Sequence, residues 1–289
     1  MKILVLGATG QLGSIIYKGL QERHEVIGTS RKKHPGMIEF DPFRDDWSLL
    51  GKSQVLINCI GQIEATRDSS FEHIHVDLTK LIIRNRDMVG ASKILQISAL
   101  GASEHHHALF LKTKGIADNL LVEYPGTAVI RPSIVCTHRT MIIRKMLLLS
   151  KIGRWMLGVI PIPSRFMKTK IQPVMPEDLL ELVERLCSDT TQRVVNAVGP
   201  ETISFGELID NMKKIRNQSM KLIEVPKLLF DFLVRFFMNP MFPGIINWQQ
   251  YQLLFEDNIA EAKSAEKILG RSMTSTREFF INEFANAAN

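Results

Sequence analysis

Apolar and polar positions alternate between two periods in the first half of the chain. Helical spacing, with apolar side chains every three or four positions, recurs at residues 11–21, 72–89 and 108–122. Between and around these segments lie short apolar runs of strand length, at residues 3–6, 25–28, 37–40, 55–59, 93–98 and 127–131. This alternation predicts an α/β fold with a doubly wound parallel sheet, which has helices on both faces.

The second half of the chain has a different pattern. Residues 141–157 show a basic and apolar helical pattern, and Pro161 and Pro163 should break it. A helix starting at Pro176 is flanked by strand-like residues 172–175 and 193–197, and Ser204 with Glu207 forms a capping box for a further helix. We therefore expect a sheet domain of residues 1–137, to which 171–198 return, and a smaller, mostly helical lobe of residues 138–170 and 199–289.

A glycine-rich turn joins the first strand to the first helix. Gly7 permits a tight exit from the strand, Gly10 lets the backbone approach a pyrophosphate, and Gly13 lets the helix pack on the sheet. The N–H groups at the start of the helix would then face the phosphates. The motif predicts a Rossmann dinucleotide site, with a ligand-free turn as the alternative. Its expected loop residues are Gly7, Thr9, Gly10, Gln11, Leu12 and Gly13.

The end of the second strand indicates which dinucleotide binds. An acidic residue there favours NAD, but residues 29–33 read Thr-Ser-Arg-Lys-Lys. Ser30 and Arg31 suit a 2′-phosphate, because a guanidinium group forks onto phosphate oxygens. We therefore expect NADP(H) to be favoured over NAD(H). Asp41, after the third strand, is a candidate for the adenine amino group, or else a turn residue.

Further segments resemble the extended, atypical short-chain dehydrogenase/reductases. They are residues 58–61 (Asn-Cys-Ile-Gly), 97–102, 130–133, 172–178 and 198–204. Within that family the chain is most similar to the subfamily of the nucleotide-binding accessory subunit of respiratory complex I and its free-standing bacterial relatives. The resemblance implies cofactor contacts at Cys59 and Gly61. It also implies an oxidoreductase or epimerase-like enzyme acting on an unknown small-molecule substrate.

The family's catalytic pair is incomplete in this sequence. The pair is Tyr-x-x-x-Lys, in which the tyrosine is the acid or base and the lysine lowers its pKa and holds the cofactor ribose. The matching residues 110–114 read Phe-Leu-Lys-Thr-Lys, so Lys114 is present and Phe110 replaces the tyrosine. Phenylalanine cannot transfer a proton, and none of the chain's three tyrosines is followed by a lysine four positions later. The family serine would be Ser98 or, in a shifted register, Ser103.

Two functions therefore stay open. The first is an NADP(H)-dependent oxidoreductase that uses Lys114 and Ser98 without the tyrosine. The alternative is a non-catalytic NADP(H)-binding sensor, or an accessory or assembly partner of a membrane-associated redox complex. The intact glycine loop argues against an interaction protein that has lost its cofactor. Residues 105–107, three histidines, read as an exposed loop or a neutral-pH acid. No metal site is expected, because no cysteine or carboxylate partner is indicated nearby.

Charge and apolar residues suggest where a partner would bind. The net charge is +6, and no acidic residue lies between Glu123 and Glu177, where nine arginines and lysines do. This interval is either a solvated basic face or one that attracts a phosphorylated ligand, an acidic partner or a lipid surface. No nucleic-acid module is recognisable. The very apolar residues 226–238 indicate a pocket wall or, alternatively, a helix that docks on a membrane or a hydrophobic partner.

The remaining features bear on localisation. Three widely spaced cysteines fit neither a disulfide framework nor a zinc site and suggest a reducing compartment. The first residues read as a strand and a turn rather than a signal peptide, and no apolar run reaches the roughly 18 residues of a membrane span. We expect a cytoplasmic protein, peripheral at a membrane if the docking alternative holds. The sequence leaves the oligomeric state open.

Overall fold

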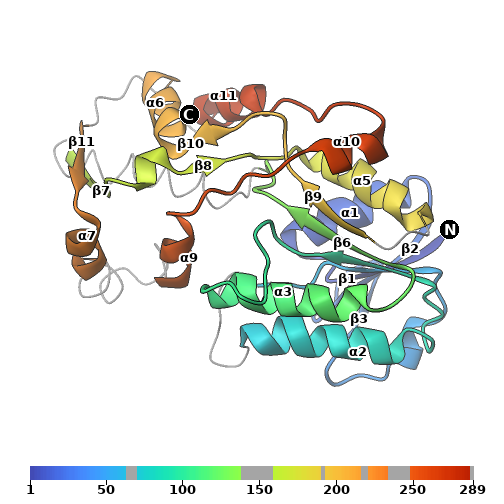
Figure 1. Ribbon diagram of the computed structural model, residues 1–289. Helices are drawn as coiled ribbons and strands as arrows, with labels where there is room; N and C mark the ends of the chain where they lie inside the picture. Colours follow the sequence, from blue (N-terminus) through green and yellow to red (C-terminus); the bar gives the residue numbers. More distant parts are fainter. Residues whose placement is uncertain (63–69, 138–158, 190–192, 216–220, 234–247, 287–289) are drawn as a thin grey trace. The chain divides into compact units, whose positions relative to one another are not determined.

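The computed structural model describes residues 1–62, 70–137, 159–189, 193–215, 221–233 and 248–286 (Figure 1). The chain divides into two compact units. The first comprises Met1–Pro132, Pro176–Ala197 and Glu261–Ser272, and the second Ser133–Met175, Val198–Ala260 and Met273–Asn289. The helix expected over 141–157, five of the nine cations of the basic interval and the end of the apolar segment 226–238 lie outside the described residues. No helix of the described part has the length and apolar character of a membrane span.

The first unit is built on a seven-stranded sheet in which every neighbouring pair of strands is parallel. The strand order is β3-β2-β1-β4-β5-β6-β9, so the predicted doubly wound parallel sheet is confirmed. Central strands are buried on both faces, which explains why they read as continuous apolar runs. The strands are β1 (Lys2–Leu6), β2 (Glu25–Ser30), β3 (Met37–Glu39), β4 (Val55–Asn58), β5 (Lys93–Ile97), β6 (Thr127–Pro132) and β9 (Arg193–Ala197).

Helices cover both faces of this sheet (Figure 1). One face carries α1 (Gln11–Gln21) and α5 (Pro176–Ser188), and the other carries α2 (Leu78–Asn85) and α3 (Leu109–Val122). The helix expected over residues 72–89 instead begins with a π-helical turn, η2 (His73–Asp77), and its α-helical part ends at Asn85. A 3-10 turn, η1 (Trp47–Leu50), precedes β4.

The strand order fixes where a ligand can approach. The chain leaves β3 at one edge of the sheet and crosses to β4 on the far side of β1. At such a switch point the connections diverge, which opens a crevice beyond the carboxyl ends of the two strands. Leu6 and Asn58 are register partners there, and the Cys59 N–H donates to the Leu6 carbonyl at 3.0 Å. The glycine turn and residues 58–61 therefore lie side by side.

The second unit combines short strands and helices around its own apolar core, which includes Ile160, Phe205, Tyr251 and Phe284. Parallel β7 (Val159–Pro163) and β11 (Lys221–Val225) form one sheet, and antiparallel β8 (Lys170–Ile171) and β10 (Ile203–Ser204) form another. The helices that the structure describes here are η3 (Phe166–Lys168), α6 (Phe205–Ile215), α7 (Lys227–Leu233), α9 (Trp248–Leu253) and α11 (Arg277–Asn286).

Local expectations for the second unit succeed in part. The capping box is confirmed, since the Glu207 N–H donates to Ser204 Oγ at 3.2 Å and Glu207 Oε2 accepts from the Ser204 N–H at 2.7 Å. Pro161 and Pro163, expected to end a helix over 141–157 that lies outside the described residues, are themselves part of strand β7. Both strands of a two-stranded sheet are edges, where a missing N–H is tolerated. The strand expected at residues 172–175 is reduced to an isolated bridge at Val174.

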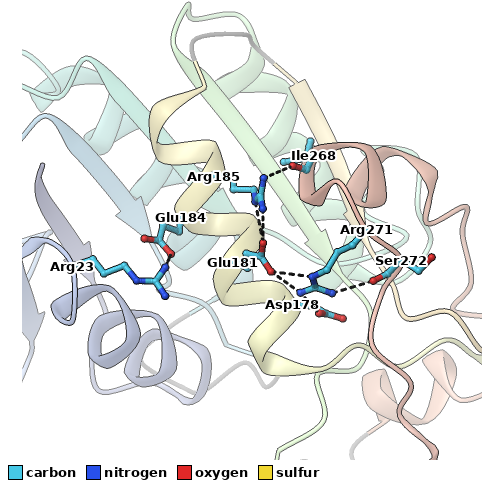
Figure 2. Close-up of polar contacts among 8 residues, drawn as sticks. All are labelled: Arg23, Asp178, Glu181, Glu184, Arg185, Ile268, Arg271 and Ser272. Carbon is cyan, nitrogen blue, oxygen red and sulfur yellow. Dashed lines mark hydrogen bonds and ion pairs between the residues drawn. The ribbon is translucent and has the colours of Figure 1, made fainter.

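The units also differ from the expected boundaries. Helix α10 (Lys263–Leu269) and the residues after it belong to the first unit, because they pack on α5 and β9. Arg271 joins them to α5 by ion pairs of 2.8 Å to Asp178 and 2.6 Å to Glu181 (Figure 2). An ion pair between residues far apart in the sequence leaves no local pattern. The sequence alone therefore assigns residues 261–272 to the smaller lobe. Residues 133–137 and 171–175, expected in the sheet domain, group with the second unit.

We predict that Arg271→Met lowers the free energy of unfolding by about 3 kcal/mol, because it leaves the fully buried Asp178 carboxylate without its cation. Urea unfolding at neutral pH measures this loss. The control is Arg23→Met, since Arg23 is largely exposed and its pair with Glu184 should contribute less than about 1 kcal/mol. Equal losses in the two variants would contradict a larger contribution of the buried Asp178 ion pair to the free energy of unfolding.

Candidate functional site

The turn between β1 and α1 depends on glycine at two positions. Gly7 has φ +75°, and a Cβ atom on Gly13 would lie 2.1 Å from the Gly7 carbonyl oxygen. The helix therefore packs directly on the turn. Gly10 is the N-cap of α1 and supplies no side-chain cap, so no cap side chain competes for the first-turn N–H groups. Located where β1 and β4 diverge, these N–H groups and the helix dipole fit a phosphate.

The end of β2 supports this turn. The Ala8 N–H donates to the Thr29 carbonyl at 3.0 Å, and Thr9 Oγ1 lies 3.4 Å from Ser30 Oγ. Ser30 is buried, whereas the Arg31 side chain is exposed and forms no ion pair within the described part of the chain. Ser30, one of the two residues predicted to determine which dinucleotide binds, thus lies beside the glycine turn. Arg31, the other, follows it and has an exposed guanidinium group.

Asp41 has a different local role. Its Oδ1 accepts from the Phe43 N–H at 3.0 Å, and its Oδ2 lies 3.8 Å from Arg44 Nε. The Asp41 N–H in turn donates to Asp45 Oδ2 at 2.7 Å. Two roles were expected for Asp41, a contact to the adenine amino group or a place in a turn. These contacts favour the turn, because the carboxylate already stabilises the chain after β3.

Lys114 reaches from α3 to the ends of β4 and β5. Its Nζ donates to the Ile97 carbonyl at 2.9 Å, and a Cβ on Gly61 would lie 3.2 Å from it. Burial lowers the pKa of Lys114 to about 8, although the nearby Asp118 charge acts in the opposite direction. Burial also raises the pKa of the Cys59 thiol to about 12, so this thiol is protonated at neutral pH. The amine is therefore the more readily titrated of the two groups near pH 8.

Ser98 is held in a buried polar contact. Its Oγ donates to Asp118 Oδ2 at 2.9 Å, and the same oxygen accepts from Arg131 Nε at 2.8 Å. Since a hydroxyl has one proton to donate, this contact supports a structural role for Ser98 rather than proton transfer. Burial raises the pKa of Asp118 although Arg131 opposes the shift. The alternative, Ser103, is exposed, and its Oγ accepts from the His105 N–H.

Phe110 lies one helical turn before Lys114, as the sequence predicts, and belongs to an aromatic cluster. Its ring is 6.0 Å from Phe71 and 5.8 Å from His75, centroid to centroid. His75, on the π-helical turn, is buried and its Nδ1 lies 2.8 Å from Thr113 Oγ1. Sequence reasoning missed His75, because the extra residue of a π-helical turn changes which side chains face α3.

The aromatic cluster keeps His75 neutral. Burial, together with the nearby Lys114 charge, lowers the pKa of His75 to about 3. When the folded pKa lies below the unfolded value of about 6.5, the unfolded chain takes up the proton first as pH falls. Stability is therefore lost as pH falls from about 6.5 toward 3.

We predict that between pH 7.5 and pH 5 the wild type loses about 2 kcal/mol more unfolding free energy than His75→Phe does. Urea unfolding at the two pH values measures the difference, which cancels any constant effect of the substitution. The exposed His34 provides the control, because His34→Gln should keep the wild-type pH dependence. An unchanged pH dependence in His75→Phe would contradict a buried neutral imidazole.

The structure also contains a groove away from these residues. It encloses about 1020 Å³ and is lined by Met1, His24 and residues of α5 and α10. Met1 and His24 directly precede β1 and β2, so this groove lies at the amino ends of the strands. Ligands of open parallel sheets bind at the carboxyl ends. Among its charged side chains, Arg23 pairs with Glu184 and Arg185 with Glu181 (Figure 2), and we assign the groove no ligand.

Sequence comparison finds relatives among mitochondrial respiratory subunits. The NADH-ubiquinone oxidoreductase 40 kDa subunit of Neurospora crassa is 22% identical over 282 residues, covering 90% of this chain and 72% of that protein. The NADH dehydrogenase (ubiquinone) 1 alpha subcomplex subunit 9 of Arabidopsis thaliana is 25% identical over 288 residues, covering 88% and 70%. No protein-family model matches the sequence.

Structural comparison finds the same fold in dinucleotide-binding enzymes. UDP-glucuronic acid 4-epimerase of Bacillus cereus, in complex with UDP-glucuronic acid and NAD, gives a TM-score of 0.72 at 16% identity over 100% of this chain and 99% of that one. The protein RMD of Pseudomonas aeruginosa, complexed with NADPH, gives 0.68 at 14% identity over 99% and 98%. The chain therefore has the fold of these dinucleotide-bound proteins, and its sequence is similar to these subunits of complex I.

Proposed function

We propose that this protein binds NADP(H) and holds it without the tyrosine-based proton transfer of its family. Its role would be that of an accessory or assembly partner of a membrane-associated redox complex. The observation that carries the proposal is Phe110, which lies one helical turn before Lys114 and packs in an aromatic cluster. The site therefore retains the lysine and lacks the acid.

The residues around the switch point fit the cofactor. The uncapped start of α1 suits the pyrophosphate, Ser30 and Arg31 suit a 2′-phosphate, and Cys59 and Gly61 flank the crevice between β1 and β4. Lys114, reaching Gly61, would hold the ribose, as in the family. NAD and NADPH accompany the structural neighbours described above, which supports a nicotinamide dinucleotide as the ligand. When bound, that group can donate or accept a hydride.

The structure reduces the set of residues that could replace the missing tyrosine. The Ser98 proton is directed at Asp118, and burial keeps His75 neutral and hard to protonate. The sequence relatives are subunits of a respiratory complex, which favours a role as a component over a role as a free enzyme. These three facts support retention of the cofactor rather than turnover.

A second candidate, an oxidoreductase acting on an unknown small molecule, has one observation in its favour. With a pKa of about 8, Lys114 loses or gains a proton near neutral pH, which an acid or base in catalysis must do. In this candidate the Lys114 ammonium would deliver the proton that the family takes from tyrosine. Ser98 would then serve only to order Asp118.

We expect the protein to bind NADPH more tightly than NADH, and Arg31→Ala to weaken NADPH binding about tenfold to a hundredfold. The reason is the loss of a charge-assisted contact to the 2′-phosphate, while NADH lacks that phosphate. Titration monitored by nicotinamide fluorescence gives both affinities. Lys33→Ala, an exposed cation of the same loop, is the matched control. Equal weakening of NADH and NADPH by Arg31→Ala would contradict the assignment of the 2′-phosphate.

We also expect bound NADPH to stay reduced in the presence of a panel of quinones, aldehydes and ketones. Absorbance of the reduced nicotinamide, followed over hours against protein-free samples, tests this. Oxidation that the wild type catalyses and Lys114→Met abolishes, at saturating NADPH, would favour the oxidoreductase. Loss of binding without any wild-type oxidation would assign Lys114 to holding the cofactor.

A further inference from the structure

Asp118 is a buried carboxylate one helical turn after Lys114, on the same face of α3. A carboxylate that is only 1% exposed needs other groups to compensate for the water that it loses. Two donors reach it, and both bind the same oxygen, since Ser98 Oγ lies 2.9 Å and Arg131 Nε 2.8 Å from Oδ2. Its Oδ1 is buried and has no hydrogen-bond partner among the described residues. The carboxylate therefore has acceptor capacity to spare.

The end of β5 connects this carboxylate to Lys114. Lys114 Nζ donates to the Ile97 carbonyl at 2.9 Å, and the next residue, Ser98, donates to Asp118. The backbone is fixed to β6 at this point, because the Ser98 N–H donates to the Ile130 carbonyl at 2.7 Å. Two groups of opposite charge on α3 are thus held by two consecutive residues at the carboxyl end of the sheet.

Other ionisable groups around Lys114 in the described part of the chain are uncharged near neutral pH or exposed to solvent. Cys59, after β4, and His75, on η2, both lie close enough to act on the amine. Burial raises the pKa of Cys59 to about 12, and burial together with the Lys114 charge lowers the pKa of His75 to about 3. The cations of α2, Lys80 and Arg84, are exposed.

Asp118 therefore supplies the negative charge beside Lys114, within the residues that the structure describes. Arg131, on β6, opposes the rise that burial causes in the pKa of Asp118 and so favours the ionised carboxylate. The Arg131 side chain is 22% exposed, so water compensates for part of its own charge. Without the carboxylate, Lys114 would be a buried amine with no opposite charge, which favours its neutral form.

We propose that Asp118 is a positioning residue of the candidate site, which keeps the Lys114 amine charged and directed at the ends of β4 and β5. This role rests on the proposed function, because the ribose of the dinucleotide is the group that Lys114 would hold. A charged amine binds ribose oxygens more strongly than a neutral one. Ser98 and Arg131 would act on the cofactor site only through Asp118.

The first test titrates Lys114 in the full chain without nucleotide. Competitive labelling with a trace of acetic anhydride over a pH series, followed by peptide mass spectrometry, measures the fraction of neutral amine. We expect half-maximal labelling of the wild type near pH 8. In Asp118→Asn the midpoint should be lower by about one pH unit, because the opposite charge is lost.

Asp178→Asn is the matched control for the labelling. It also removes a fully buried carboxylate that pairs with an arginine, but Asp178 belongs to α5, on the opposite face of the sheet. The Lys114 midpoint should therefore be the same in this variant as in the wild type.

The second test follows NADPH binding by nicotinamide fluorescence at pH 6 and pH 8. Because the charged amine is the form that binds, Asp118→Asn should match the wild type at pH 6 and bind about fivefold more weakly at pH 8. A purely structural contribution of Asp118 would change the affinity equally at both pH values. The double variant Asp118→Asn with Arg131→Gln leaves no unpaired guanidinium group, should show the same shift, and replaces the single variant if that one does not fold.

The results separate this proposal from the function on which it rests. An unchanged Lys114 midpoint in both Asp118 variants, with NADPH bound by the wild type, would overturn the role of Asp118 and leave the proposed function intact. Equal weakening of binding at pH 6 and pH 8 would overturn that role as well. A wild type that binds neither NADPH nor NADH would overturn the proposed function itself, whatever the labelling shows.

Discussion

The packing of helix α1 on the turn that precedes it sets the geometry on which the candidate site depends. A side chain at Gly13 would collide with the Gly7 carbonyl, so helix and strand approach closely only with glycine there. This contact directs the start of α1 toward the crevice between β1 and β4. The end of β2 is joined to the same turn through Thr29 and Ser30. The proposed phosphate site and the loop proposed to select the dinucleotide thus both depend on this close approach of helix and turn.

The region around Lys114 has one member of the Tyr-x-x-x-Lys pair and lacks the other. Gly61 leaves room for the Lys114 amine, and the buried Asp118 balances part of its charge. The acid that Lys114 would activate is absent, and Phe110 instead fills its position among other aromatic rings. The proposed binding groups are therefore present without the tyrosine of the pair, which fits a protein whose relatives are respiratory subunits.

Much of the first unit was predictable, because strands buried on both faces and amphipathic helices leave local patterns. The glycine turn and the replacement at Phe110 are equally local. Three features were not predictable. Arg271 assigns residues 261–272 to the first unit through a contact distant in sequence, and a π-helical turn brings His75 to α3. The register of β7 with β11 likewise joins basic and apolar segments that lie far apart along the chain.

The central claim is that the chain retains NADP(H). The most direct measurement is to denature the protein as purified, without added nucleotide, and to identify what it releases by mass spectrometry. The account predicts NADPH or NADP⁺ at close to one molecule per chain, and a strong depletion of it in protein carrying Arg31→Ala. Release of NAD(H), or of no dinucleotide from protein that also fails to take up added NADPH, would contradict it.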